Sequence, residues 1–186
     1  MSENDATPPV ATKDEPTGTK NHPTMAARTK NDPVLATENE ARQALIDACL
    51  RMAALGLNTG RAGNVSVRWH RGGPRGAGML ITPAAMPCET MVIDDIAWLP
   101  LDIDDEAVAG GGVAGARPGL RASSEWRLHR DTYLARAEVG AVVHAHSPVA
   151  SALACVKLVQ EHGIPAFHYM IAVAGGADIR CAPYRL

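Results

Sequence analysis

The chain lacks three features that would place it in a specialised class: a long apolar run, a basic stripe and closely paired cysteines. No apolar run approaches the roughly 20 residues that a helix needs to cross a bilayer, so the sequence does not indicate a membrane protein. The formal net charge is −2 without a basic stripe, which excludes an electrostatic footprint for nucleic acid. The four cysteines contain no Cys-x-x-Cys pair, a usage typical of core thiols in a reducing compartment. We therefore expect a cytoplasmic protein.

The first 37 residues differ in composition from the rest of the 186. They contain five of the 13 prolines and no aromatic residue, and they lack the apolar core of a signal peptide. Such a segment buries too little apolar surface to offset the entropy lost on ordering. We predict a disordered tail over 1–37 and one folded domain over 38–186.

Local patterns predict most of the secondary structure. The segment 37–40 has the form of a capping box that opens a helix, and Gly56 is a plausible stop. Residues 64–69 alternate in the manner of a strand, and residues 79–82 complete a hairpin. The remaining predictions are a strand over 98–103 with Pro100 at an edge, a loop over 109–119, a helix capped by Ser123 or Ser124 and running to Arg136, a strand over 140–146, a helix from Pro148 to Leu158, and a short helix over 170–174.

Two histidines lie two positions apart after an apolar run. On a strand, side chains at i and i+2 point to the same side, so His144 and His146 can reach one metal ion. Neutral imidazole suits zinc, but a catalytic zinc takes about three protein ligands. The alternative is that one histidine ends the strand and the other fills a polar gap. Glu125 is likewise either a general base or a residue favoured by the helix dipole.

Small polar residues suggest an anion site. Gly63 and Asn64 follow a turn, and Ser123 and Ser124 stand at a helix start, where hydroxyls and backbone N–H groups bind phosphate oxygens. The alternative is that these residues only turn the chain and cap the helix. Two further residues of that helix, Trp126 and His129, are expected to pack rather than to react.

Five segments occur in an order that is characteristic of one enzyme family. They are residues 60–66, 80–83, 123–129, 142–146 and 164–170. On these motifs the chain resembles the class II aldolase/adducin head family, and within it the L-fuculose-phosphate aldolases, over about residues 38–186. The family also contains pentulose-phosphate 4-epimerases. The resemblance implies a three-layer α/β/α domain around a largely antiparallel sheet, usually a homotetramer with active sites between subunits.

The same resemblance implies roles for individual residues. His144 and His146 would be zinc ligands, and Glu125 would exchange a proton with the hydroxymethyl carbon of the substrate. Tyr169, from a neighbouring subunit, would handle the proton on the aldehyde oxygen. The residues expected to hold the substrate phosphate are Gly63, Asn64, Ser123 and Ser124.

The chain departs from the family pattern at three places. Ala84 and Ala85 replace a hydroxyl residue and a glycine that help to bind phosphate, and Ala122 replaces a proline. The family also takes a third zinc histidine from a later His-Gly segment that this chain lacks. We therefore expect the last strands and helices of the domain to be missing, and zinc binding and activity to be weak.

The leading hypothesis is a zinc-dependent aldolase. It would cleave a ketose 1-phosphate similar to L-fuculose 1-phosphate into dihydroxyacetone phosphate and a small aldehyde, through a metal-stabilised enediolate. The alternatives are a pentulose-phosphate 4-epimerase and a non-catalytic, adducin-head-like assembly module. The epimerases tend to carry an aspartate where this chain has Glu125, which favours aldol cleavage.

Overall fold

The structure, a computed structural model, describes residues 37–70, 76–103, 108, 116–173, 176 and 178–182. The predicted tail lies outside the described residues except for Thr37, and so does most of the predicted loop over 109–119. Among the helices that are described, none combines the length and the apolar character needed to cross a membrane.

Helix α1 (Glu38–Ala54) begins as the sequence predicts. The Thr37 hydroxyl accepts a hydrogen bond from the Glu40 backbone at 3.2 Å, and the Glu40 carboxylate accepts one from the Thr37 backbone at 2.9 Å. Gly56 follows the helix with φ +68°, a left-handed conformation that glycine adopts without steric cost. The apolar side chains that α1 buries are Ala41, Leu45, Ile46, Cys49 and Met52.

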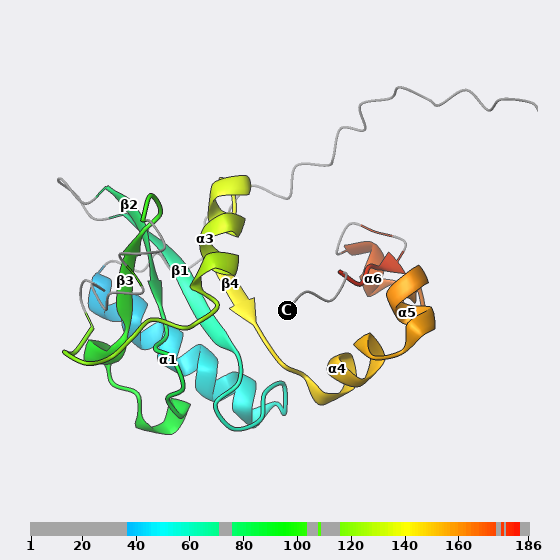
Figure 1. Ribbon diagram of the computed structural model, residues 1–186, viewed down its shortest axis with the longest axis horizontal. Helices are drawn as coiled ribbons and strands as arrows, with labels where there is room; N and C mark the ends of the chain where they lie inside the picture. Colours follow the sequence, from blue (N-terminus) through cyan, green and yellow to red (C-terminus); the bar gives the residue numbers. More distant parts are fainter. Residues whose placement is uncertain are drawn as a thin grey trace, which may run out of the picture. The chain divides into compact units, whose positions relative to one another are not determined.

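Four antiparallel strands form the main sheet in the order β3-β2-β1-β4 (Figure 1). Their bounds are β1 (Asn64–His70), β2 (Ala77–Ile81), β3 (Ala97–Pro100) and β4 (Ala141–His144). β1 and β2 form the predicted hairpin, and β3 lies at an edge, where Pro100 is tolerated. The predicted strand over 140–146 is too long. Asn64, the first residue of β1, pairs with His144, so no residue of β1 remains to pair with His146.

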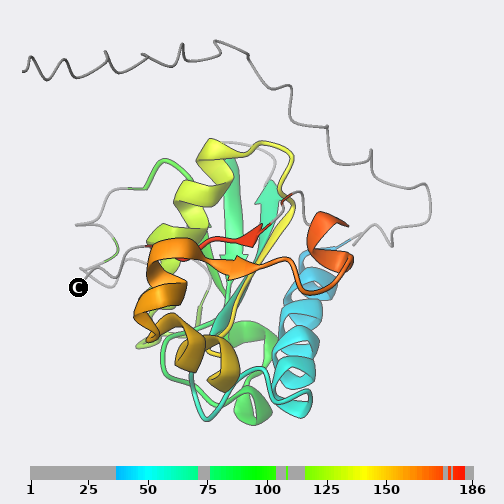
Figure 2. The same cartoon turned by 90° about the vertical axis from the view of Figure 1, so that its right-hand side faces the viewer.

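Helices cover both faces of this sheet (Figure 2). Successive strand residues point to opposite faces. Leu80 and Trp98 accordingly pack with α1, whereas Met79 and Leu99 pack with the aromatic side chains of α3 (Trp126–Ala135). The helix, sheet and helix layers confirm the predicted α/β/α class.

The start of α3 differs from the prediction. The helix begins at Trp126 with Glu125 at the N-cap position, and neither Ser123 nor Ser124 is the cap. The Ser123 backbone N–H donates to the Thr82 carbonyl at 3.0 Å, which holds Ser123 against an extended segment rather than in a helix. Its hydroxyl accepts a bond from the Glu125 N–H at 3.3 Å, so Ser123 organises the turn before the helix.

The described residues between 148 and 179 form short elements. They are α4 (Pro148–Ala154), α5 (Lys157–His162), β5 (Ile164–Pro165), α6 (Met170–Val173) and β6 (Asp178–Ile179), with β5 and β6 paired antiparallel. Pro148 stands in the first turn of α4 as predicted, but the single helix to Leu158 is wrong. Val156 has an extended backbone (φ −81°, ψ 120°), a conformation that suits its β-branched side chain and separates α4 from α5.

Candidate active site

Glu125, His144 and His146 meet where β4 ends and α3 begins. The His144 Nε2 lies 3.1 Å from Oε1 of Glu125 and 2.9 Å from Nε2 of His146, and the His146 Nε2 lies 3.9 Å from the same carboxylate oxygen. One ligand atom from each residue lies within 4.8 Å of the others. Each of the three side chains is partly accessible to solvent.

This donor set fits a divalent cation such as zinc. Two imidazole nitrogens and one carboxylate oxygen are ligands that zinc prefers, and tetrahedral ligands around zinc are separated by roughly 3.3 Å. The three observed separations bracket that value. The pair of imidazoles predicted from the sequence is therefore joined by the carboxylate of Glu125, for which the sequence predicts either a general base or a residue favoured by the helix dipole, but not a metal ligand.

The strand register and one side chain position the histidines. His144 pairs with Asn64 across β1 and β4, and the backbone N–H of His146 donates to Oδ1 of Asn58 at 2.7 Å. Gly63 leaves room for Asn58, because a Cβ atom built on Gly63 would lie 2.2 Å from the Asn58 amide nitrogen. Gly63 also has φ +76°, so a side chain there would be strained. Asn58 was not singled out from the sequence.

The second oxygen of Glu125 is held by a buried polar network. Nδ2 of Asn64 lies 2.5 Å from Oε2 of Glu125, and Oδ1 of Asn64 lies 2.5 Å from Nε2 of His129. Nδ1 of His129 lies 2.7 Å from the Ser66 hydroxyl, which lies 2.7 Å from the hydroxyl of Tyr133. His129 is thus a member of the site rather than a packing residue alone.

Burial sets the protonation states in this network. Desolvation, with a smaller contribution from the neighbouring His144, lowers the pKa of His129 from 6.5 to about 4 against an opposing effect of Glu125. Desolvation likewise raises the pKa of Tyr133 to about 12. At neutral pH the imidazole of His129 is therefore neutral and the hydroxyl of Tyr133 keeps its proton.

A hollow of about 360 Å³ opens beside the carboxylate of Glu125 and the imidazole of His146. The residues predicted to hold phosphate, Gly63, Asn64, Ser123 and Ser124, all line it together with Glu125 and His146. Tyr169 does not line it; its side chain is 75% exposed and its ring lies against His168. The structure thus brings the predicted phosphate residues together with the acid/base candidate.

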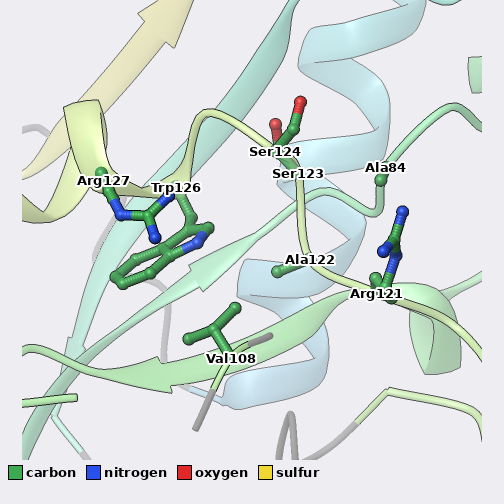
Figure 3. Close-up of a pocket in the computed structure, with 8 residues that line it drawn as sticks. All are labelled: Ala84, Val108, Arg121, Ala122, Ser123, Ser124, Trp126 and Arg127. Carbon is green, nitrogen blue, oxygen red and sulfur yellow. The ribbon is translucent and has the colours of Figure 1, made fainter. Parts of the chain in front are cut away.

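A smaller hollow of about 210 Å³ adjoins the first and shares its two serines (Figure 3). Figure 3 shows Ser123 and Ser124 together on the segment that leads into α3, with Ala84 near Arg121. Apolar side chains of Val108 and Trp126 also line this space.

An arginine stands where the sequence departs from the family pattern. Nη1 of Arg61 donates to the Ala85 carbonyl at 3.2 Å, and Arg61, Ala84 and Ala85 line the larger hollow. Ala85 has φ +54°, the only non-glycine residue with positive φ among the described residues. Ala85 thus has the left-handed backbone conformation that favours glycine, and its carbonyl accepts a hydrogen bond from the Arg61 guanidinium. Arg61 was not selected from the sequence, although its place beside Gly63 was a usable signal.

Comparison with known proteins identifies relatives of the chain. A family described as Class II Aldolase and Adducin N-terminal domain matches residues 43–186. A 5-methylthioribulose-1-phosphate/5-deoxyribulose-1-phosphate aldolase of Rhodospirillum rubrum is 45% identical over 143 residues, which are 77% of this chain and 55% of that protein. An L-fuculose phosphate aldolase of Escherichia coli K12 is 40% identical over 146 residues, 78% of this chain and 58% of that protein. The chain therefore spans little more than half the length of these curated relatives.

A solved structure gives the same result for the fold. An L-fuculose 1-phosphate aldolase matches with a TM-score of 0.64 and 30% sequence identity, covering 82% of this chain and 62% of that chain. The layers described above are thus those of the class II aldolase fold.

Proposed function

This chain belongs to the class II aldolase and adducin N-terminal domain family, and from that premise we propose that it cleaves a ketose 1-phosphate into dihydroxyacetone phosphate and a small aldehyde. The proposal is based mainly on the position of the Glu125 carboxylate. It lies beside His144 and His146, at the edge of a hollow lined by Ser123 and Ser124. The names of the relatives support a ketose 1-phosphate as the substrate class.

The phosphate of the substrate would lie in the hollow beside Glu125. The hydroxyls of Ser123 and Ser124 and the half-buried backbone at Gly63, which line this hollow, are suited to phosphate oxygens. Asn64 keeps a second amide hydrogen after its bond to Glu125, which leaves one donor for the same anion. We include Arg61 in this subsite, because its guanidinium supplies charge where Ala84 and Ala85 supply no hydroxyl.

Glu125 would act as the acid/base. In the condensation direction its carboxylate removes a proton from the hydroxymethyl carbon of dihydroxyacetone phosphate, and in cleavage the protonated carboxyl returns that proton to the enediolate carbon. His144 and His146 would hold a zinc ion, with Glu125 as a third donor only while no substrate is bound, and the ion would supply Lewis-acid polarisation of the substrate oxygens.

Tyr169 is proposed to act in the site of another subunit. The carbon that becomes the aldehyde carries a hydroxyl whose proton has to leave during cleavage, and a tyrosine side chain can accept that proton as the phenolate and return it as the phenol. The exposure of Tyr169 and its absence from the lining of this chain's hollow support a role in a homotetramer, whose sites lie between subunits.

Product formation tests the proposal. Purified protein with zinc is supplied with L-fuculose 1-phosphate or 5-deoxyribulose 1-phosphate, and dihydroxyacetone phosphate is followed by coupled NADH oxidation. We expect product from the wild type, loss of about 10²–10⁴-fold in Glu125→Gln, and wild-type rates in the matched variant Glu138→Gln, whose exposed carboxylate pairs with Arg136. Conversion of a pentulose phosphate to its epimer without release of dihydroxyacetone phosphate would contradict the proposal.

A further inference from the structure

We propose that Asn64 and His129 are positioning residues for Glu125, within a hydrogen-bond chain whose direction is fixed from Tyr133 to the carboxylate. The proposal rests on the function proposed above for Glu125. The members come from two elements. Asn64 and Ser66 are two apart on β1, and Glu125, His129 and Tyr133 recur every four residues from the start of α3, so strand and helix spacing bring them to one line.

The Glu125 carboxylate determines which group donates in each hydrogen bond of the series. An ionised carboxylate only accepts hydrogen bonds, so the atom of Asn64 that faces Oε2 of Glu125 is the NH₂ group. The carbonyl oxygen of the same amide then faces His129, as the contact at 2.5 Å records. Because that oxygen only accepts, Nε2 of His129 has to carry the hydrogen.

The remaining bonds then have one arrangement. A neutral imidazole with its hydrogen on Nε2 accepts at Nδ1, so the Ser66 hydroxyl donates to it. The oxygen of Ser66 is left to accept from the hydroxyl of Tyr133. The low pKa of His129 and the high pKa of Tyr133 agree with both assignments. Each donor in the series points toward Glu125.

Burial fixes the direction of these hydrogen bonds. The residues Asn64, Ser66, His129 and Tyr133 are at most 4% exposed, so water does not substitute for a missing partner. Reversing the Asn64 amide would place its oxygen against the Glu125 carboxylate and its NH₂ group against an N–H. The network therefore holds Oε2 of Glu125 and leaves Oε1 directed at His144 and His146.

The tautomer of His129 directly tests the assigned direction of the hydrogen bonds. Uniformly ¹⁵N-histidine-labelled wild-type protein is examined by long-range ¹H–¹⁵N correlation NMR at pH 7, and His129 is assigned by comparison with His129→Gln. We expect the Nε2–H tautomer with an unprotonated Nδ1. An Nδ1–H tautomer or a doubly protonated ring at pH 7 would overturn the proposal. This measurement needs no substrate, so it separates the bonding order from the aldolase activity.

Steady-state kinetics test whether the hydrogen bonds from Asn64 and His129 position Glu125. The variant His129→Phe removes both ring nitrogens, whereas His129→Gln retains an NH₂ donor for Asn64. We expect His129→Phe to lower kcat on the order of tenfold or more with KM changed less than about twofold, and His129→Gln to recover most of that kcat. Folding is checked by circular dichroism and thermal melting. A folded His129→Phe or, if that variant does not fold, a folded Asn64→Leu with wild-type kcat would overturn the proposal.

The two proposals fail in different ways. If the wild type forms no dihydroxyacetone phosphate but His129 is the Nε2–H tautomer, the proposed function falls and the hydrogen-bond order stands. If the wild type is active and His129 is the Nδ1–H tautomer, the function stands and the positioning role falls.

Discussion

The sheet with its two helices and the segment over 148–182 bury their apolar side chains to different extents. In the first region Met79, Leu80 and Leu99 are completely buried. In the second, α4 and α5 contain no buried residue, and Leu158 and Phe167 are 66% and 75% exposed. Glu125 and His144 stand on the first region, where packing on both faces of the sheet fixes the backbone. A site that needs atoms placed to a fraction of an ångström thus lies on the region that has its own core.

The largest contrast is expected in stability. Leu80→Ala opens a cavity between β2 and α1 and should lower the free energy of unfolding by about 2–5 kcal/mol. Leu158→Ala removes an exposed side chain and should change it by less than about 0.5 kcal/mol. Urea unfolding measures both. Equal losses in the two variants would show that the second region contributes a core of its own.

Zinc affinity gives the next contrast. His144→Ala removes one of three donors and should weaken zinc binding on the order of 100-fold. The matched variant His162→Ala, which changes a histidine at the end of α5, should leave the affinity unchanged. Isothermal titration with zinc distinguishes them. Comparable weakening in both would place the zinc outside the cluster of Glu125, His144 and His146.

Acid should destabilise the first region through His129. Its pKa is lowered from 6.5 in the unfolded chain to about 4 in the folded protein, so the unfolded state binds the proton first and stability falls as pH decreases from 6.5 toward 4. Between pH 7 and pH 5 the loss should be about 2 kcal/mol at ~1.4 kcal/mol per pKa unit. The titratable groups that act on His129 are His144 and Glu125, and the hydroxyl of Tyr133 joins the same network.

The variant His129→Gln isolates this contribution. Its unfolding free energy, measured with urea at pH 7 and pH 5, should decrease by about 2 kcal/mol less than that of the wild type. An unchanged pH dependence in this variant would mean that His129 becomes protonated as readily in the folded protein as in the unfolded chain.

The smallest contrast concerns two arginines. Arg61→Gln removes a charge from the hollow and should raise KM for the sugar phosphate about tenfold, which is ~1.4 kcal/mol, with kcat little changed. Arg180→Gln, in the second region, should have no effect on KM. Steady-state kinetics at fixed ionic strength measures both. A KM that is insensitive to Arg61 would remove this residue from the phosphate subsite.

The sequence predicts those features that depend on near neighbours. The Thr37 capping box, the β1–β2 hairpin and the edge position of Pro100 are confirmed, because each follows from residues within a few positions. The extent of β4 and the cap of α3 are not predicted correctly. The partner strand decides where β4 ends at His144, and a bond to Thr82 decides the conformation of Ser123.

In the candidate site, too, features set by near neighbours are predicted from the sequence and features set by distant contacts are not. Spacing alone pairs His144 with His146, and the family motifs select Glu125. The environment of Glu125 depends on Asn64, 61 positions away, and that of His129 on Ser66, 63 positions away. No local pattern reports such contacts, although polar residues every four positions from Glu125 to Tyr133, on a helix that packs against the sheet, are an indication of a buried network.

The most direct measurement is the location of the cation. Crystals grown with zinc and measured on both sides of the zinc absorption edge give an anomalous difference map. We predict a peak between Glu125, His144 and His146, at about 2.0–2.1 Å from a nitrogen of each imidazole. A strong peak elsewhere, or none at this cluster in zinc-saturated crystals, would contradict it.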